Sequence, residues 1–208
     1  MLDFIESQSI NRLDVKKVTG DDQLANHHLL DASDTKRTLN KVDQGAFRKA
    51  LSRFPTGVTI VTGYSPENQM PIGLTVSSFN SVSLCPALVV WSLSNKSQHV
   101  MAFEKGNPHR IHVLAQSQEA LATHFAQSGT DKFAGLQALS KSPATHPEHS
   151  FESIPCLTGC SARFDCTTEN VYSAGDHYMI LARVLFFEAS DSAPLVFARG
   201  RFCGLSSF

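Results

Sequence analysis

The sequence predicts a mainly β protein with a few helices, folded as a mostly antiparallel barrel. Short segments rich in β-branched residues recur from residue 58 into the C-terminal third, and few helical segments separate them. This pattern argues against a doubly wound parallel sheet, in which a helix would follow each strand. The sequence also contains neither a GxGxxG motif nor a P-loop, so we expect any nucleotide to be bound without a Rossmann phosphate turn.

Length and charge limit the class of protein. The 208 residues suffice for one well-buried domain. The net charge of -1 lacks the basic excess needed to bind a nucleic-acid backbone, so we expect no nucleic-acid partner. No stretch approaches the ~20 apolar residues of a membrane span, and the N-terminus carries acids where a secretory signal has a basic start. We therefore expect a cytoplasmic protein without a membrane segment.

The five cysteines form an odd set, without a CxxC pair or a nearby histidine at zinc-finger spacing. They predict reduced thiols and no metal site. A metal or redox role stays open for Cys156, Cys160 and Cys166, which lie close together in the sequence. The histidines other than His177 show no spacing typical of a metal site, and we expect most of them to be exposed.

Residues 1–40 are polar and carry no steady apolar period, so we expect an extension that wraps a neighbouring subunit or stays mobile. One domain is expected over residues 41–208. It begins with an amphipathic helix after the N-cap Asp43, which Pro55 and Gly57 end. The apolar positions of this helix are Ala46, Phe47, Ala50, Leu51 and Phe54.

Strands and helices are then expected in turn, from β-branched runs and from apolar residues at helical spacing. Strands are predicted over 58–62, 74–79, 87–91, 110–115 and 178–187, with turn-rich sequence over 63–71. A short helix is predicted over 97–104 and a surface loop over 137–153. A second helix begins at the N-cap Ser117 and has Leu121, Ala122 and Phe125 on one face.

Five hydroxyl side chains crowd into the strand-like run over residues 73–83: Thr75, Ser77, Ser78, Ser81 and Ser83. Each hydroxyl is both a donor and an acceptor in little space, which suits a phosphate, a ribityl chain or the polar edge of a flavin ring. A solvent-facing strand and turn with ordinary hydroxyls explains the same residues, and both interpretations stay open.

A second polar cluster follows the apolar strand over 87–91. Ser92, Ser94, Asn95 and Ser97 accompany Lys96 just before the predicted helix, and this layout suits an anion site at a helix N-terminus. Ordinary N-capping accounts for Ser97 equally well.

A third candidate is the Gly175-Asp176-His177 turn at the start of the long C-terminal strand. His177 is a donor or proton relay that titrates near neutral pH, and Asp176 could set its tautomer, although a plain turn also explains Gly-Asp. Arg199 and Arg201 could hold a cofactor phosphate or stay solvated.

Taken in order, these segments resemble the flavin reductase-like, FMN-binding split-barrel family, which includes the reductase components of two-component monooxygenases. The resemblance covers about residues 43–205. It rests on seven motifs: FRKALSRFPTGVTIVT (47–62), the 73–83 run, VLAQSQ (113–118), FA (125–126), DKFAG (131–135), GDH (175–177) and RGRF (199–202).

The resemblance implies an antiparallel split β-barrel and a homodimer with the flavin near the subunit interface. In this sequence it implies that cofactor contacts come from four groups of residues. The first group, Pro55 and Thr56, would lie near the ring, and the second, Thr75, Val76, Ser77 and Ser78, would lie along the ring and the ribityl chain, with Ser81 as a further candidate of the same run. The third group would approach the phosphate and consists of Ser92, Ser94, Asn95 and Ser97. The fourth, Lys132 and Phe133, would belong to a loop over the cofactor. His177 and Arg201 match positions on the nicotinamide side, and His177 is the candidate catalytic residue.

The implied activity is hydride transfer from NADH or NADPH to FMN or FAD, with reduced flavin supplied to an oxygenase component. One alternative is an electron carrier or flavin-binding protein that retains FMN without efficient NAD(P)H activity. Another is an enzyme that uses bound flavin on its own organic substrate. The choices between FMN and FAD and between NADH and NADPH stay open, as does the identity of the oxygenase.

Overall fold

The computed structural model describes residues 42–208 except 130, 138, 141–150 and 206–208. The predicted extension over 1–40 and most of the predicted loop over 137–153 therefore lie outside the described residues. The described elements are α1 (Gln44–Leu51), β1 (Thr56–Gly57), β2 (Thr59–Tyr64), β3 (Pro71–Val76), β4 (Asn80–Leu84), β5 (Ala87–Ser94), η1 (Val100–Phe103), β6 (Pro108–Val113), η2 (Gln116–Gln118), α2 (Glu119–Ala126), β7 (Leu139–Ser140), β8 (Cys156–Leu157), β9 (Ala162–Ala174), β10 (His177–Ala189), β11 (Val196–Ala198) and β12 (Arg201–Cys203).

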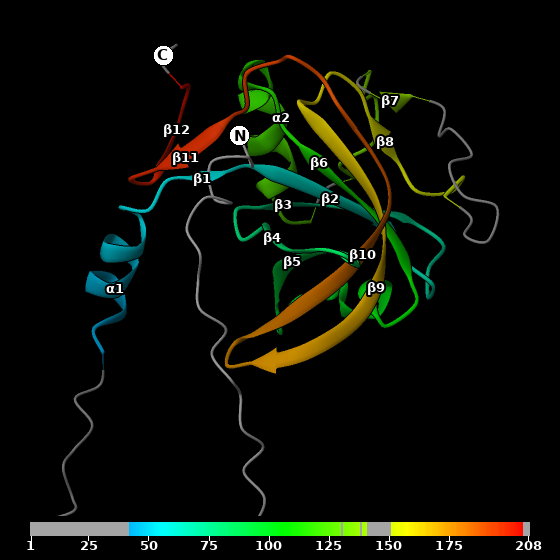
Figure 1. The fold of residues 1–208 in the computed structure, drawn as a ribbon, viewed down its shortest axis with the longest axis horizontal. Helices are drawn as coiled ribbons and strands as arrows, with labels where there is room; N and C mark the ends of the chain where they lie inside the picture. Colours follow the sequence, from blue (N-terminus) through cyan, green and yellow to red (C-terminus); the bar gives the residue numbers. More distant parts are fainter. Residues whose placement is uncertain (1–41, 130, 138, 141–150, 206–208) are drawn as a thin grey trace, which may run out of the picture. The chain divides into compact units, whose positions relative to one another are not determined.

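Seven strands form the main sheet, in the order β3-β2-β6-β9-β10-β5-β4 (Figure 1). Every strand pair in it is antiparallel. Two smaller sheets, β1-β11-β12 and β7-β8, accompany it. The prediction of a mainly β, antiparallel fold with few helices is confirmed.

The sheet curls around an apolar core. Trp91, Phe103 and Ile111 are buried at its centre, and the Trp91 and Phe103 rings meet edge to face with centroids 4.9 Å apart. Strand β5 follows the period of two, because Val89, Trp91 and Leu93 are buried while Ser92 and Ser94 stay partly exposed. The curl brings Ser78, just past β3, to β5, where the Ser92 N–H donates to Ser78 Oγ at 2.8 Å.

A second apolar cluster lies between the sheet and α2. Ala122 and Phe125 of α2 are buried in this cluster with Ile60 and Leu114 of the chain near β2 and β6. Helix α2 approaches β3 so closely at Gly73 that a Cβ there would lie 2.2 Å from the Phe125 ring. A glycine is therefore needed at position 73 for this packing.

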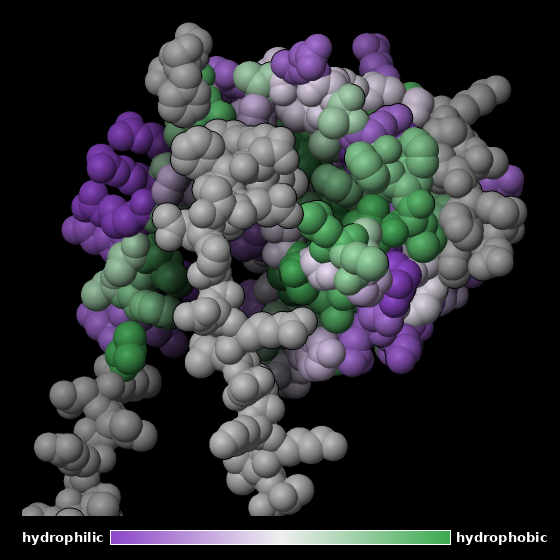
Figure 2. Space-filling view, in the orientation of Figure 1, coloured by the Kyte–Doolittle hydropathy of each residue, from purple (hydrophilic) through white to green (hydrophobic). Residues whose placement is uncertain are grey.

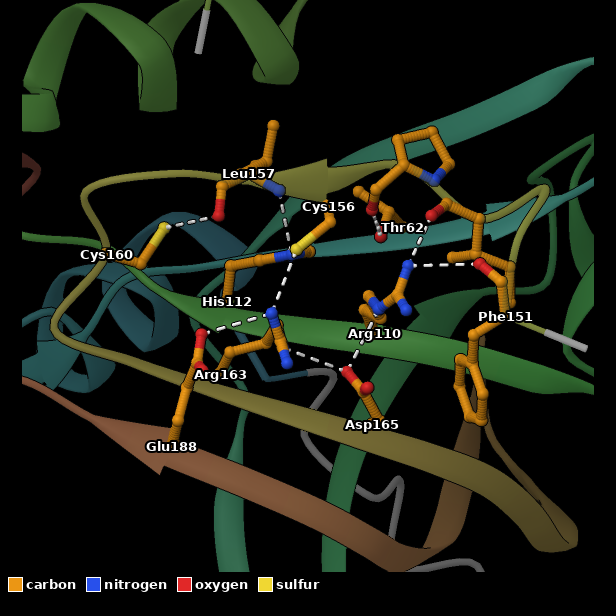
Figure 3. A network of polar contacts seen from close by, with 12 residues as sticks. Thr62, Arg110, His112, Phe151, Cys156, Leu157, Cys160, Arg163, Asp165 and Glu188 are labelled. Carbon is orange, nitrogen blue, oxygen red and sulfur yellow. Dashed lines mark hydrogen bonds and ion pairs between the residues drawn. The ribbon is translucent and has the colours of Figure 1, made fainter. Parts of the chain in front are cut away.

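Polar groups on the sheet form a buried network, which Figure 3 shows from close by. We call Arg110, His112, Arg163 and Asp165 the buried polar network. Arg110 Nε lies 3.0 Å and Arg163 Nε 3.1 Å from Asp165 Oδ1, and all four side chains are almost fully shielded from solvent.

This network fastens the segment that runs from Phe151 to β8 onto the sheet. Arg110 Nη1 donates to the carbonyls of Phe151 and Ile154. The Leu157 N–H donates to His112 Nε2 at 3.1 Å, while His112 Nδ1 donates to the Ile60 carbonyl at 3.1 Å. The network thus satisfies buried main-chain groups that a purely apolar face would leave without partners.

Several sequence predictions at element ends are wrong. The helix predicted over 97–104 is the four-residue 3-10 helix η1, and Ser97 Oγ instead accepts from the His99 N–H at 3.2 Å. Ser117 lies within η2, so it does not cap α2. The strand predicted over 74–79 ends at Val76, before Ser77 and Ser78 leave the sheet. At Ser97, a local hydroxyl contact takes the place of the predicted helix cap.

Two predictions on side chains meet different outcomes. The expectation that most histidines are exposed is wrong for His109 and His112, which are fully buried. All five cysteines are free in the structure, in agreement with the predicted thiols. None of the helices within the described residues is long and apolar enough to cross a membrane.

Helix α1 forms as predicted, because Asp43 Oδ1 accepts from the N–H groups of Gly45 and Ala46. Its apolar side chains have no cover within the described residues, and Phe47 and Leu51 are 53% and 56% exposed. Figure 2 shows apolar and polar surface side by side at this helix. An uncovered apolar side of this kind is typical of a surface that packs against other protein.

Candidate functional site

A cavity of about 1070 Å³ lies between β3 and the end of β5. The loop before η1 and the loop after α2 complete its walls. The structure brings together on this lining nine of the residues that the sequence singled out: Thr75, Val76, Ser77, Ser78, Ser92, Ser94, Ser97, Lys132 and His177. Residues more than 100 positions apart in the sequence thus share one site.

On the β3 wall of the cavity, the hydroxyl groups differ in whether they already form hydrogen bonds within the protein. Thr75 Oγ1 donates to the Ala122 carbonyl at 2.7 Å, so this hydroxyl ties β3 to α2. Ser77 and Ser78 follow the last ladder residue, Val76, and are exposed. Ser78 Oγ accepts a hydrogen bond from the Ser92 N–H and donates one to the Ser92 carbonyl. These bonds fix the hydroxyl at the seam, by which we mean the place where the end of β3 approaches β5.

The β5 wall presents alternate residues to the cavity, because the intervening ones enter the core. Ser94 Oγ accepts from the Lys96 N–H at 3.3 Å, and Ser97 Oγ accepts from the His99 N–H. These contacts order the loop and use hydroxyl lone pairs, while each hydroxyl proton remains a donor for a ligand.

Cations gather on the cavity without matching carboxylates. Lys96 and Lys132 line it together with the imidazole of His99, while Asp131 is its one lining carboxylate among the described residues. Asp131 Oδ1 accepts from the N–H groups of Phe133 and Ala134, which holds it in its own turn. The surplus of positive groups favours an anionic ligand.

Burial lowers the pKa of Lys132 below the ordinary value for lysine. Burial, and after it the positive charge of Lys132, lower the pKa of His99. The shift of Lys132 reflects the cost of holding a charge in a partly dry cavity, and the shift of His99 adds the repulsion of a second positive charge to that cost.

His177 reaches the cavity from the start of β10. The two-residue turn before it uses Gly175 at φ 67°, a left-handed conformation that glycine adopts without strain. His177 Nδ1 donates to Asp176 Oδ1 at 2.7 Å, and this hydrogen bond lowers the pKa of Asp176. The pair orients the imidazole and leaves Nε2 for a ligand.

Six predicted site residues do not line this cavity. Thr56 belongs to β1 and Arg201 to β12, in the small sheet that also contains β11, and Pro55 precedes β1. Ser81 lies on the exposed edge strand β4. The roles assigned to these four residues stay predictions.

The other two lie directly beside the cavity residues. The Asn95 N–H donates to the Asp176 carbonyl at 3.0 Å, which joins the β5 wall to the turn before His177. Phe133 packs on Phe125 with ring centroids 5.2 Å apart. Both residues support the walls, and their predicted cofactor contacts stay predictions.

Sequence reasoning missed several lining residues, among them Asn68, His99, Gln127, Ser128 and Asp131. Most come from turns without a motif of their own. Lys96, which the sequence named as the cation of the predicted anion site, does line the cavity. His99 carried no such signal, since its position depends on how the loop before η1 folds.

The model of the flavin reductase like domain matches residues 51–206 of the chain. An NADH-dependent FMN reductase of Agrobacterium fabrum is 40% identical over 76% of this chain and 83% of its own length. The reductase subunit of a flavin-dependent monooxygenase of Rhodococcus jostii is 34% identical over 79% of each chain.

A solved structure agrees with these relatives. The NADH:FAD oxidoreductase of Streptomyces globisporus, in complex with NAD and FAD fragments, superposes with a TM-score of 0.67 and is 28% identical. The match covers 86% of this chain and 98% of that chain. The described fold is therefore shared over nearly the whole of that structure.

Proposed function

The chain belongs to the family defined by the flavin reductase like domain, and from this membership we propose that it is an NAD(P)H-dependent flavin reductase. The observation that carries the proposal is the cavity between β3 and β5. It combines a row of serine hydroxyls with cations that have no carboxylate partner in the described part of the chain. Hydroxyl donors beside positive charge are what a phosphate-bearing, polyhydroxylated ligand requires.

The lining fits a flavin. Its volume of about 1070 Å³ reaches the upper end of the usual range for ligand sites, which leaves room for a second ligand. Ser77, Ser78 and Ser92 would hold the polar ring edge and the ribityl chain from the seam between the two walls. Ser97 and Lys96 would hold the phosphate, because they supply a hydroxyl and an ammonium from one loop.

His177 is placed to bind the nicotinamide side. The bound cofactors supply the hydride-transfer chemistry, so the protein has to bind and orient them. The hydrogen bond to Asp176 fixes the imidazole, and the free ring nitrogen can donate to or accept from a carboxamide. His177 therefore acts as a binding and orienting group at this site.

We also propose that the curled sheet is a split barrel and that two copies of the chain pair as a homodimer. The contact between Ser78 and β5 supports the barrel, because it joins strands near opposite ends of the sheet. The uncovered apolar side of α1 supports the dimer. In such a dimer Pro55, Thr56 and Arg201, which do not line the cavity of their own chain, would reach the partner's flavin.

The proposed product is reduced flavin, supplied to an oxygenase component. One relative is named as the reductase subunit of a flavin-dependent monooxygenase, and this name supports the proposal for this chain. A cytoplasmic location remains the prediction from the sequence.

Steady-state assays of the purified chain test this function. NADH or NADPH is mixed with excess FMN or FAD, and loss of the nicotinamide absorbance is followed anaerobically and in air. Rapid oxidation that depends on added flavin supports the reductase. Tight FMN retention without nicotinamide oxidation would establish the electron carrier instead, and oxidation only with an added organic compound would establish a substrate-specific flavoenzyme.

A further inference from the structure

Lys132 is held in a fixed position with an ammonium whose charge is not neutralised. Its Nζ donates to the Gly73 carbonyl at 2.9 Å and to the Phe125 carbonyl at 2.8 Å. An ammonium has three donors, so one remains after these two bonds. No carboxylate within the described ranges pairs with Lys132, although the side chain is partly buried. A half-dry cation on a cavity wall is a ready partner for an anion.

His99 lies on the same cavity and comes from a different element. The loop before η1 carries it, whereas the turn after α2 carries Lys132. The His99 ring makes no hydrogen bond to any other described residue, and the charge of Lys132 acts on it. The two side chains therefore line one cavity from two different elements, and both have donor capacity to spare.

This pair continues a series of polar groups along the β5 wall. The series begins at Ser92 and Ser94, continues to Ser97, and reaches His99 through the bond between Ser97 Oγ and the His99 N–H. The proposed function places one phosphate near Ser97 and Lys96. Beyond Ser97 this loop brings His99 to the cavity, and the turn after α2 brings Lys132 to the same cavity.

We propose that His99 and Lys132 form a second phosphate subsite, which binds the additional phosphate of a dinucleotide flavin and makes FAD a tighter ligand than FMN. The inference rests on the proposed function, because it assumes that the cavity holds a flavin. A mononucleotide leaves this subsite without an anion. A dinucleotide places its second phosphate directly beside the first, and His99 is held two residues from Ser97 by the hydrogen bond from its backbone N–H to Ser97 Oγ.

Binding measurements on the full chain test the subsite. Dissociation constants for FAD, FMN and NADH are measured by calorimetry for the wild type, Lys132→Met and His99→Gln. We expect the wild type to bind FAD about tenfold more tightly than FMN. Each variant should weaken FAD about tenfold and FMN less than twofold, which is the size of one charge-assisted hydrogen bond at a partly exposed site.

Lys105→Met is the matched control, because Lys105 is exposed and lies outside this cavity. It should leave all three dissociation constants unchanged. Thermal unfolding of each variant reports folding, and His99→Gln keeps the test valid if loss of the Lys132 contacts loosens the loop. Equal weakening of FAD and FMN would overturn the proposal, as would weakening of NADH alone, which would assign the subsite to the nicotinamide nucleotide.

Failure of the proposed function has a different signature. In that case the wild type binds neither flavin and oxidises no NADH when flavin is added. If the wild type binds both flavins with equal affinity and reduces them, the flavin reductase function stands and the second phosphate subsite is wrong.

Discussion

The molecule holds two groups of polar side chains with opposite relations to their surroundings. In the buried polar network, Arg110, Arg163 and Asp165 meet within about 3 Å and are shielded from water. In the second group, Lys132 and His99 both line the cavity, and neither forms an ion pair with a carboxylate in the part of the chain that the structure describes. The network pairs opposite charges, and the cavity keeps the charge of Lys132 without a carboxylate partner among the described residues.

The difference distinguishes polar residues that stabilise the fold from polar residues that bind ligands. Charges that the fold buries must be paired, because an unpaired buried charge costs several kcal/mol. Charges that line an open cavity can stay unpaired, since water solvates them until a ligand arrives. The network should therefore govern the stability of the fold, and the cavity should govern the affinity for ligands. Each prediction below changes one region and measures both properties.

The largest effect is expected at Arg110. Arg110→Met removes one partner of the buried Asp165 and two hydrogen bonds to the carbonyls of Phe151 and Ile154. We expect a loss of about 3–5 kcal/mol in the free energy of unfolding, measured by urea denaturation. Flavin affinity of the folded protein should stay within twofold.

Arg183→Met is the matched control, because Arg183 pairs with Glu169 in an ion pair about 40% exposed on each side. This substitution should leave the free energy of unfolding nearly unchanged, because solvent screens an exposed ion pair. Equal losses in the free energy of unfolding for Arg110→Met and Arg183→Met would show that burial does not decide how much an ion pair contributes to stability.

A second effect concerns acid stability. Burial lowers the pKa of His112 to about 3 and that of His109 to about 4 from the ordinary 6.5. As the pH falls below 6.5 the unfolded chain takes up these protons before the folded chain does. The free energy of unfolding should therefore fall between pH 6.5 and about 4, by about 2 kcal/mol per histidine at pH 5.

His112→Gln isolates this contribution, since the amide keeps a donor and an acceptor but does not titrate. Urea denaturation at pH 5 and pH 7 should show a smaller pH dependence for the variant than for the wild type. An unchanged pH dependence would contradict a neutral, buried His112.

A smaller effect is expected at the seam between the cavity walls. Ser78→Ala removes a hydroxyl of the lining and the acceptor of the Ser92 N–H. Flavin binding should weaken about threefold to tenfold in a fluorescence titration, while the free energy of unfolding changes by less than about 1 kcal/mol. Ser173→Ala, on the exposed end of β9, is the control and should change neither value.

The smallest effect is expected at the nicotinamide side. His177→Ala should raise the KM for NADH about twofold to tenfold and leave flavin affinity within twofold, because one exposed hydrogen-bonding group is lost. Asp176→Asn keeps an acceptor for the imidazole and should have a weaker effect. Unchanged steady-state kinetics with both substrates in His177→Ala would remove His177 from the site.

Local patterns predicted those parts of the fold that depend on neighbours in the sequence. The Asp43 cap begins α1, and alternation of buried and exposed residues identifies β5. Patterns failed where a residue makes a contact that its neighbours do not indicate. Ser97 resembled a helix cap, yet it accepts from the His99 N–H in a turn. His112 resembled a surface histidine, yet β2 and β8 enclose it.

The candidate site shows the same division. The hydroxyls of the 73–83 run and of the end of β5 could be identified from composition, because five serines and threonines are unusual in the strand-like run over 73–83. Their meeting at Ser78 and Ser92 could not, since it follows from the order of seven strands. His99 had no signal at all, because only the folding of two separate loops brings it near Lys132.

By itself, the sequence determined the mainly antiparallel architecture, the helix after Asp43, the hydroxyl-rich strands and the Gly-Asp-His turn. These features depend on side-chain type and on spacing over a few residues, which a sequence displays directly. Tertiary structure decided which charges are paired and which face a cavity, because partners such as Arg110 and Asp165 lie 55 positions apart. The chain therefore indicates its fold locally, and the functional site exists only once the sheet has curled.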